Sequence, residues 1–474
     1  MKTAEQDRSA SPKPRLRATA RPPGPGALET LLLLPRLLSN PVLTCRELTT
    51  TYGGIVRLNL GVDTLYLLGQ PEHAEYVLRE RDEHFGKGGK LWAAARPIFG
   101  VGLATSEGEL WLRQRRLMQP QFTRSRFAAL GERMIAAIQE ELVRWPALAA
   151  GEPFNLTEQI IYISMRIFLR TLFDTGVSDE EREELGRASH VLMTRLHYIT
   201  WGSILPKWFV LPGAQRASEA LQLVDRLVFR TIEKRRREAR EPREGGEGGD
   251  RSGDLLSQLL AARDEPTGES MSDRQVRDEA VTLILSGYET TATTIIWSLY
   301  QIARRPEVER KLLAEIDQVL GKRTPTFEDT AGLSYVKMVI SETLRFHSTA
   351  WMTHRVSTVD EEIGGFRVPA DSLVIVLIDS IHHNPTVWED PDEFRPERFS
   401  PEASAGRSRA AFIPFGMGPH QCIGNNFALI EATLVLVMLL QRYRIKLTSD
   451  HAIEPLPRMI QKPGVPVMVQ LEPR

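Results

Sequence analysis

The stretch Phe415-Gly416-Met417-Gly418-Pro419-His420-Gln421-Cys422-Ile423-Gly424 decides how the rest of the chain is interpreted. Its glycines let the backbone turn tightly around Cys422 and approach a flat ligand without a Cβ clash. The apolar residues 423–440 predict a helix, so Cys422 would lie beside free N–H groups that favour a thiolate over a thiol. Such a thiolate is suited to be an axial iron ligand. A buried core cysteine, the alternative, requires none of these glycines.

This segment resembles the haem-thiolate loop of the cytochrome P-450 family, Phe-Gly-x-Gly-x-(Arg or His)-x-Cys-x-Gly, at every fixed position. The resemblance implies that Cys422 is the proximal ligand of the iron of haem b. It also implies that Phe415 and Gly424 belong to the cofactor site, with Phe415 packed near the sulfur, and that His420 donates to a haem propionate. Many members carry Arg at this last position, and histidine keeps a donor whose charge depends on pH.

Composition limits the classes of partner. The 474 residues include 60 Lys and Arg against 61 Asp and Glu, a net charge of −1. This balance gives no overall case for nucleic acid or an anionic membrane as partner. The two cysteines, Cys45 and Cys422, and 42% hydrophobic residues fit a reduced cytoplasmic protein with a full core and no disulfide framework.

The N-terminal region carries no sign of a membrane anchor. Residues 1–21 are polar and basic and predict a disordered segment ahead of a single domain over residues 22–474. The apolar run 28–38 is interrupted by Glu29, Pro35 and Arg36 and is shorter than the about 20 apolar residues that span a bilayer. We therefore expect a soluble protein of bacterial type.

The first part of the domain predicts strands at 55–60 and 64–68 and a helix from Pro71. Residues 84–108 are Gly-rich and aromatic without a clear period. The resemblance implies a loop over the substrate pocket, and a packed loop without ligand contact is the alternative. Trp111 and Arg115 share a helix face and match the family's Trp-x-x-x-Arg helix, which implies that both bind a haem carboxylate.

A long helix is predicted from a capping box at Ser272 to about Arg304. Its segment Ser286-Gly287-Tyr288-Glu289-Thr290-Thr291 resembles the family's (Ala or Gly)-Gly-x-(Asp or Glu)-Thr-(Thr or Ser). The resemblance implies that Glu289, as a solvent-linked acid, and Thr290, as a hydrogen-bond donor, relay protons to bound dioxygen. A surface acid and a hydroxyl bonded back to its own helix are the alternative. Ser286 departs from the pattern and places a hydroxyl on the pocket side.

A structural triad is implied by Glu342 and Arg345, which resemble the family's Glu-x-x-Arg helix, together with Arg398. A buried ion pair needs such extra donors to offset desolvation, so the triad would lock the haem-binding core. Arg355 matches a propionate-binding arginine. Three further residues are expected to line the substrate pocket: Trp351, Met352 and Met459.

Other segments give weaker signals. Residues 366–378 predict paired strands, and His382-His383 are expected to be core or exposed histidines rather than metal ligands, because neighbours in a strand or turn point apart. Residues 190–211 resemble the family's mobile lid or form a buried helix pair. Residues 235–254, rich in charge and glycine, predict an exposed flexible loop.

The resemblance covers residues 22–471 and implies one mostly α domain with a smaller β region, with haem between the long central helix and the Cys422 loop. It implies insertion of one oxygen atom from dioxygen into a hydrophobic small molecule such as a terpenoid, fatty acid, steroid or polyketide. Electrons would come from a separate ferredoxin or flavodoxin with its NAD(P)H-dependent reductase, docking near Arg113 and Arg116. A haem-binding sensor and a haem-thiolate isomerase or peroxygenase are the alternatives.

Overall fold

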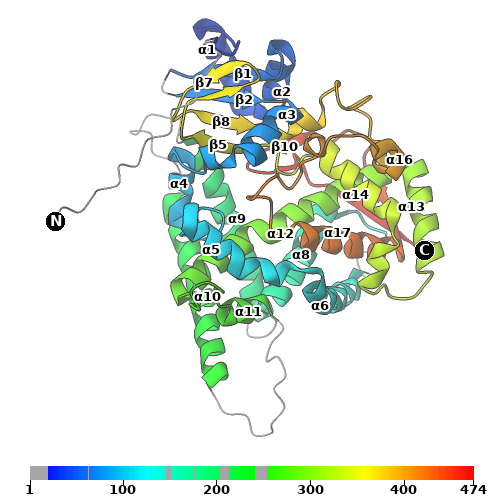
Figure 1. The fold of residues 1–474 in the computed structure, drawn as a ribbon. Coiled ribbons are helices and arrows are strands. Elements are labelled where there is room, and N and C mark those ends of the chain that lie inside the picture. The colour runs from blue at the N-terminus through cyan, green and yellow to red at the C-terminus, as the bar shows by residue number, and fades with distance from the viewer. Residues whose placement is uncertain (1–19, 62, 146–150, 174–177, 203–212, 241–253) are drawn as a thin grey trace, which may run out of the picture.

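The computed structural model describes residues 20–61, 63–145, 151–173, 178–202, 213–240 and 254–474. Of the segment expected to be disordered, residues 1–19 lie outside the described part. Helices form the body of the molecule around α12 (Asp273–Ala303), and the largest sheet lies at one end of that body (Figure 1). The expected combination of a mostly α domain with a smaller β region is confirmed.

The other longer helices are α1 Ala27–Ser39, α2 Pro41–Tyr52, α4 Lys90–Phe99, α5 Gly108–Met118, α6 Arg124–Leu142, α8 Leu156–Phe173, α9 Asp179–Gly202, α10 Ala214–Arg240, α11 Leu255–Ala261, α13 Pro306–Val319, α14 Ser334–Phe346 and α17 Asn425–Leu440. The shorter ones are α3 Pro71–Glu75, the π-helical turn η1 Tyr76–Glu80, η2 Asp82–His84, η3 Gln119–Phe122, η4 Glu328–Ala331, α15 Ile378–His382, η5 Pro396–Phe399, α16 Pro401–Ser404 and η6 Arg409–Ala411.

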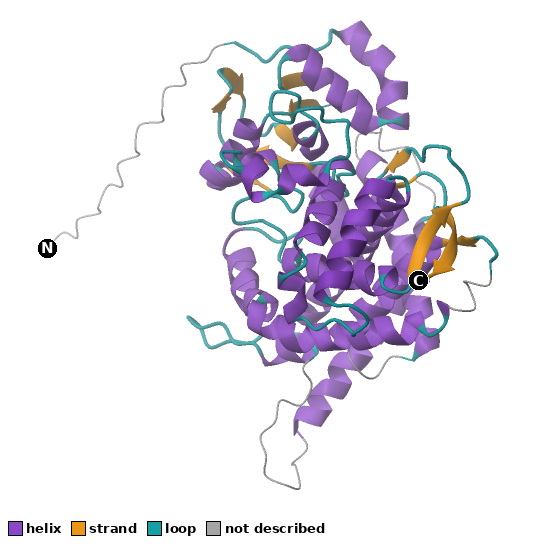
Figure 2. Ribbon diagram, turned by 90° about the vertical axis from the view of Figure 1, so that its right-hand side faces the viewer, coloured by secondary structure: helices purple, strands orange, loops and turns teal. Residues whose placement is uncertain are grey.

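The strands are β1 Ile55–Asn59, β2 Thr64–Leu68, β3 Phe85–Gly86, β4 Phe154–Asn155, β5 Thr353–Ser357, β6 Glu361–Ile363, β7 Phe366–Val368, β8 Leu373–Val376, β9 Tyr443–Leu447, β10 Pro455–Pro457, β11 Gln461–Pro463 and β12 Met468–Pro473. Five of them form a sheet in the order β1-β2-β8-β5-β3. Its β2–β8 pair is parallel, with Leu65 opposite Leu373, and its β5–β8 pair is antiparallel. Smaller sheets lie at the edges of the helical body (Figure 2).

Helix α12 is the central element. Its N-terminus is closed by the predicted capping box, in which Gln275 N donates to Ser272 Oγ and Ser272 N donates to Gln275 Oε1. Most of its 31 residues are buried, because the helix is enclosed by α8, α14 and α17 rather than facing solvent on one side. The main apolar core forms around it, and two smaller cores lie against the five-stranded sheet.

Three expected segments differ in the structure. Within residues 84–108, helix α4 occupies Lys90–Phe99; glycines at both ends and the internal Pro97 conceal its periodicity in the sequence. Within 366–378, β7 pairs with β6 and β8 joins the five-stranded sheet, so the two strands do not pair with each other.

The third correction concerns residues 235–254. Helix α10 continues to Arg240, and Arg235 is buried, where it donates to Asp254 Oδ2 at 2.5 Å. Asp254 is itself buried and caps α11 by accepting from Ser257 N. Both ends of the predicted exposed loop therefore belong to the packed structure, and residues 241–253 lie outside the described part.

Candidate active site

The Cys422 loop is a tight turn between residue 415 and α17. Cys422 N donates to Phe415 O at 2.9 Å, and Gln421 N donates to Gly418 O at 3.1 Å. Gly418 has a φ of 73°, and a Cβ there would lie 1.8 Å from Leu78 O in η1. A side chain at this position would therefore clash with the backbone, which explains why the turn requires glycine.

The thiol of Cys422 faces a cavity ahead of α17, and Gly424 is the N-cap of that helix. Cys422 is exposed toward this cavity, and desolvation by the surrounding protein raises the pKa of its thiol, whereas the Gly424 N–H and the Arg115 guanidinium act in the opposite direction. The sequence predicted that the helix terminus alone would favour a thiolate, and in the polypeptide by itself burial outweighs that effect. Coordination to a metal ion deprotonates a thiol and would supply the remaining stabilisation.

The cavity beside Cys422 has a volume of about 370 Å³. Its wall comes from α12, α8, the segment after α14, and the Cys422 loop with the first turns of α17. Eight of the residues predicted for the site line it: Ser286, Thr290, Met352, Arg355, Phe415, His420, Cys422 and Gly424. Most of the other lining residues are apolar, including Phe168, Leu172 and Phe427.

A second cavity of about 220 Å³ shares Arg355, His420 and Cys422 with the first. Trp111 and Arg115 of α5 line this second space, as their spacing on one helix face predicts. The Trp111 ring packs on the His420 ring, with 3.9 Å between centroids. Arg115 Nη1 donates to Gln421 O at 3.0 Å, so α5 is joined directly to the Cys422 loop.

Positive charge gathers around the second cavity. Burial lowers the pKa of Arg355 to about 10 and that of His420 to about 3, and the nearby cations Lys87, Arg355 and Arg115 lower the latter further. Lys87 is also buried, with its pKa lowered to about 7, and donates to Leu103 O. His420 Nδ1 is buried without a hydrogen-bond partner among the described residues. A carboxylate-bearing ligand would satisfy these donors.

The donor set therefore fits a haem. A thiol faces the larger cavity from one side, apolar side chains form its walls, and the cations and the unsatisfied His420 Nδ1 lie where carboxylates of the same molecule would be bound. Lys87 and Trp92 also line the second cavity. Both lie in the 84–108 stretch expected over the substrate pocket, but the sequence assigned neither to the cofactor site. No spacing pattern distinguishes them within the Gly-rich stretch, because their position depends on how that stretch packs against α5.

The hydroxyls of α12 that face the cavity donate to their own helix. Thr290 Oγ1 donates to Ser286 O at 2.8 Å, and Ser286 Oγ donates to Thr282 O at 2.6 Å. Each oxygen keeps acceptor capacity toward the cavity. Glu289 is not a surface acid: its side chain is 3% exposed and pairs with Lys462 of β11, whose own side chain is 24% exposed. The bond of Thr290 to its own helix matches the alternative considered for that hydroxyl.

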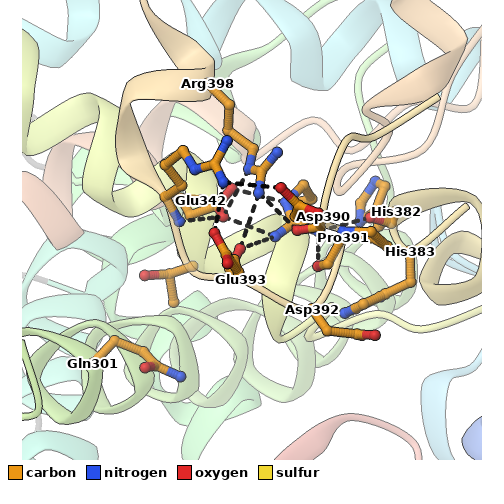
Figure 3. A network of polar contacts seen from close by, with 12 residues as sticks. Gln301, Glu342, His382, His383, Asp390, Pro391, Asp392, Glu393 and Arg398 are labelled. Atoms are coloured by element: carbon orange, nitrogen blue, oxygen red, sulfur yellow. Dashed lines mark hydrogen bonds and ion pairs between the residues drawn. The ribbon is translucent and has the colours of Figure 1, made fainter. Parts of the chain in front are cut away.

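The triad side chains meet in a buried network behind the site (Figure 3). Arg345 donates to both oxygens of Glu342, at 2.7 and 2.8 Å, and Arg398 Nε donates to Oε1 at 3.2 Å. The Arg395 backbone N–H adds a further donor to Oε1. The remaining donors of the two arginines bind main-chain carbonyls between residues 382 and 393. The network thereby ties α14 to the segment that leads to the Cys422 loop.

Two expected pocket residues lie elsewhere. Trp351 is buried against the sheet-side core, donates from Nε1 to Arg458 O, and is not among the described residues that line either cavity. Its neighbour Met352 does line the larger cavity, because adjacent residues of an extended chain point apart. Met459 is 36% exposed and likewise is not among the lining residues described.

The family model for cytochrome P450 matches residues 22–471, which is nearly the whole chain. The chain belongs to the cytochrome P450 family. Cyclooctatin synthase of Streptomyces melanosporofaciens is 34% identical over 425 residues, covering 89% of each chain. Pentalenene oxygenase of Streptomyces avermitilis is 29% identical over 432 residues, covering 91% of this P450 and 93% of the relative.

Solved structures agree with the family assignment. The crystal structure of the haem domain of cytochrome P450DA superposes with a TM-score of 0.85 at 26% identity, covering 97% of this P450 and 99% of that chain. The protein is a cytochrome P450 monooxygenase that uses haem and dioxygen. Among the described residues, none of the helices is both long and apolar enough to cross a membrane.

Proposed function

We propose that this P450 inserts one oxygen atom from dioxygen into a terpenoid, with haem b held by Cys422. The observation that carries the proposal is that the Cys422 thiol lines two adjoining cavities, one with a largely apolar wall and the other with a cluster of cationic donors. When bound, the haem supplies dioxygen activation, and the protein supplies the ligand, the binding site and protons.

The cofactor would be held at two places. Cys422 would supply the sulfur ligand, with Phe415 and Gly424 in the same loop, and Arg355 and His420 in the cavity wall would bind the carboxylates of the haem. Trp111 and Arg115 support the same carboxylates from α5, where Trp111 packs on His420. Bidentate and charge-assisted hydrogen bonds of this kind fix the orientation of a carboxylate-bearing ligand.

Substrate would occupy the part of the larger cavity bounded by α12 and the segment after α14. Ser286 and Thr290 contribute hydroxyls to this wall and Met352 contributes an apolar side chain. A terpenoid is supported by the apolar walls and by relatives whose names give cyclooctat-9-en-7-ol and pentalenene as their substrates. Apolar walls with a few polar groups orient such a molecule without a charged contact.

Proton delivery is assigned to Thr290 and Glu289. Thr290 lines the cavity and would deliver protons there, and the adjacent Glu289, which pairs with Lys462 outside the cavity wall, would resupply them. Excluding bulk water while delivering single protons would couple electron use to product formation.

Electrons would come from a ferredoxin or a flavodoxin with its NAD(P)H-dependent reductase. The suggested docking residues, Arg113 and Arg116, are partly exposed, and both form ion pairs with Asp264. Arg113 also pairs with Glu269. Their charge is therefore partly matched within the chain, which weakens the attraction that they offer an acidic partner.

The test is a titration of the ferric, haem-loaded protein with limonene, lauric acid, progesterone and erythromycin while the Soret band is followed. We expect a saturable shift to the high-spin form with the terpene at the lowest concentration. Tighter binding of the fatty acid, steroid or macrolide would replace the terpenoid assignment. Absence of any oxygenated product from the bound terpene, with electrons supplied, would contradict the proposed reaction.

A further inference from the structure

The two oxygens of the Glu289 carboxylate have different surroundings. Lys462 Nζ donates to Oε1, and His190 Nδ1 of α9 lies 4.0 Å from the same oxygen. Oε2 is buried and has no hydrogen-bond partner among the described residues. One oxygen is therefore held by cationic or potentially cationic groups, and the other is left to accept or donate a proton.

The group lies between the cavity and solvent. Thr290, the next residue of α12, lines the cavity beside Cys422, whereas Glu289 is not among the lining residues described. On its other side, the Lys462 side chain is 24% exposed and that of His190 is 66% exposed. Glu289 therefore adjoins a cavity-lining residue in the sequence and contacts side chains that reach solvent.

Lys462 is held in place by the residue before it. Gln461 N donates to Thr349 O and Gln461 O accepts from Trp297 Nε1 of α12, both at 3.0 Å. Its side-chain Nε2 donates to Asp379 Oδ1, also at 3.0 Å, and the carboxylate of Asp379 is fixed by Arg46. The backbone at Lys462 is thus anchored to α12 and to two further buried segments.

Lys462 belongs to the hairpin formed by β10 and β11, and the rest of this hairpin is anchored as well. Leu456 of β10 lies opposite Lys462 of β11, and the connecting turn accepts a hydrogen bond from Trp351 Nε1 at Arg458 O. A half-buried lysine directed at a carboxylate by this many fixed contacts loses little side-chain freedom when the pair forms. This explains the place of Trp351, which supports the hairpin instead of lining the cavity.

We propose that Lys462 is a positioning residue for proton delivery. It holds Glu289 through Oε1, so that the unpartnered Oε2 remains available to receive a proton relayed from solvent and to pass one on toward Thr290 Oγ1. Each turnover consumes one substrate C–H bond, one dioxygen, two electrons from the ferredoxin or flavodoxin and two protons, and it yields one hydroxylated product and one water. The inference rests on the relay proposed for Glu289 and Thr290.

The test compares Lys462→Met, Lys462→Arg and Glu289→Gln with the unsubstituted haem-loaded protein. A plant-type ferredoxin with its NADPH-dependent reductase supplies electrons, limonene is the probe, and the fraction of electrons recovered as hydrogen peroxide is measured. Lys446→Met is the matched control, because Lys446 of β9 pairs with Glu472 in an exposed ion pair of the C-terminal sheet. The carbon monoxide spectrum of the reduced protein verifies that each variant is folded and loaded.

We expect Lys462→Met to raise the peroxide fraction severalfold, Lys462→Arg to restore most of the coupling, and Lys446→Met to change nothing. In the Glu289→Gln background, Lys462→Met should have no further effect, because Lys462 acts through that carboxylate. Additive effects, or failure of Arg to restore coupling, would overturn the inference.

If Glu289→Gln uncouples turnover and Lys462→Met does not, the relay stands without Lys462. If neither changes the peroxide fraction, the relay itself is wrong.

Discussion

Glu342 and Arg355 are both buried charged groups, but donors of the chain bind Glu342 directly, whereas the hydrogen bonds described for Arg355 go to Thr353 and His354 and not to a carboxylate. Glu342 accepts from Arg345, Arg398 and the Arg395 backbone, so its charge is balanced within the protein. Burial lowers the pKa of Arg355 and of its neighbours Lys87 and His420, and the acids Glu107 and Asp82 do not fully offset this for Arg355. A carboxylate-bearing ligand would complete the balance. The first cluster is therefore typical of structure and the second of binding.

The largest expected effect is at Cys422, which lines the same cavity as Arg355 and His420. Cys422→Ser should abolish the thiolate-type absorption of the reduced carbon monoxide complex, because serine does not supply a thiolate to iron. Cys45→Ser is the control: Cys45 is buried in the sheet-side core, where burial raises its pKa to about 12. Retention of the thiolate-type spectrum in the Cys422 variant would move the axial ligand elsewhere.

Breaking the balanced cluster should cost stability. Glu342→Gln leaves two buried arginines without their carboxylate, and we expect the free energy of unfolding to fall by about 3–5 kcal/mol. Urea unfolding followed by circular dichroism measures it. Asp360→Asn, in the exposed pair with Arg367, should change the same quantity by less than about 1 kcal/mol. Equal effects of the two substitutions on the free energy of unfolding would show that the buried network is no more important for stability than the exposed ion pair.

Glu431 of α17 is a third type of buried charge, a carboxyl that is fully buried and whose pKa burial raises to about 8. The folded state then retains this proton up to a higher pH than the unfolded state does. The contribution of this protonated carboxyl to the free energy of unfolding is fully present below about pH 4.5 and is lost as pH rises through about 8.

Glu431→Gln should remove that loss. At pH 9 we expect the variant to be more stable than the unsubstituted protein by roughly 2–4 kcal/mol, with a much smaller difference at pH 4.5. Urea unfolding at the two pH values measures the difference. A variant that is less stable at pH 9 would show that Glu431 ionises with a favourable partner.

The smallest expected effect is at the binding cluster. Arg355→Met should leave the apoprotein as stable as before, because the charge that it removes is unfavourably buried. The loaded protein should release haem faster, corresponding to about 1.5–3 kcal/mol for a lost charged hydrogen bond. Transfer of haem to apomyoglobin measures the release. If Arg355→Met releases haem at an unchanged rate and its apoprotein is less stable, then Arg355 stabilises the fold and does not bind haem.

Local patterns in the sequence predict much of this molecule. The Ser272 capping box depends on residues three apart, and the Cys422 turn on glycines a few residues away, so both follow from short-range geometry. The α5 pair Trp111 and Arg115 was also placed correctly on one face, because helical periodicity sets it.

Long-range packing accounts for what the sequence did not predict. Lys462 meets Glu289 across 173 residues, and no spacing rule links a strand lysine to a helix acid at that separation. Lys87 was not predicted, because it reaches the second cavity only through the packing of its segment against α5. Trp351 and Met352 illustrate how small an error in register matters. They are adjacent, yet Met352 lines the cavity and Trp351 packs in the sheet-side core, because successive side chains of an extended segment point to opposite faces.

The C-terminal hairpin also bears on how the protein is synthesised. The ribosome makes α12 long before it makes residues 422 and 462, yet the iron ligand and the lysine beside Glu289 come from those late segments. A nascent chain can pack much of its helical body first, but its catalytic face stays incomplete until the Cys422 loop and the β10–β11 hairpin emerge. Haem capture therefore follows the synthesis of these two segments.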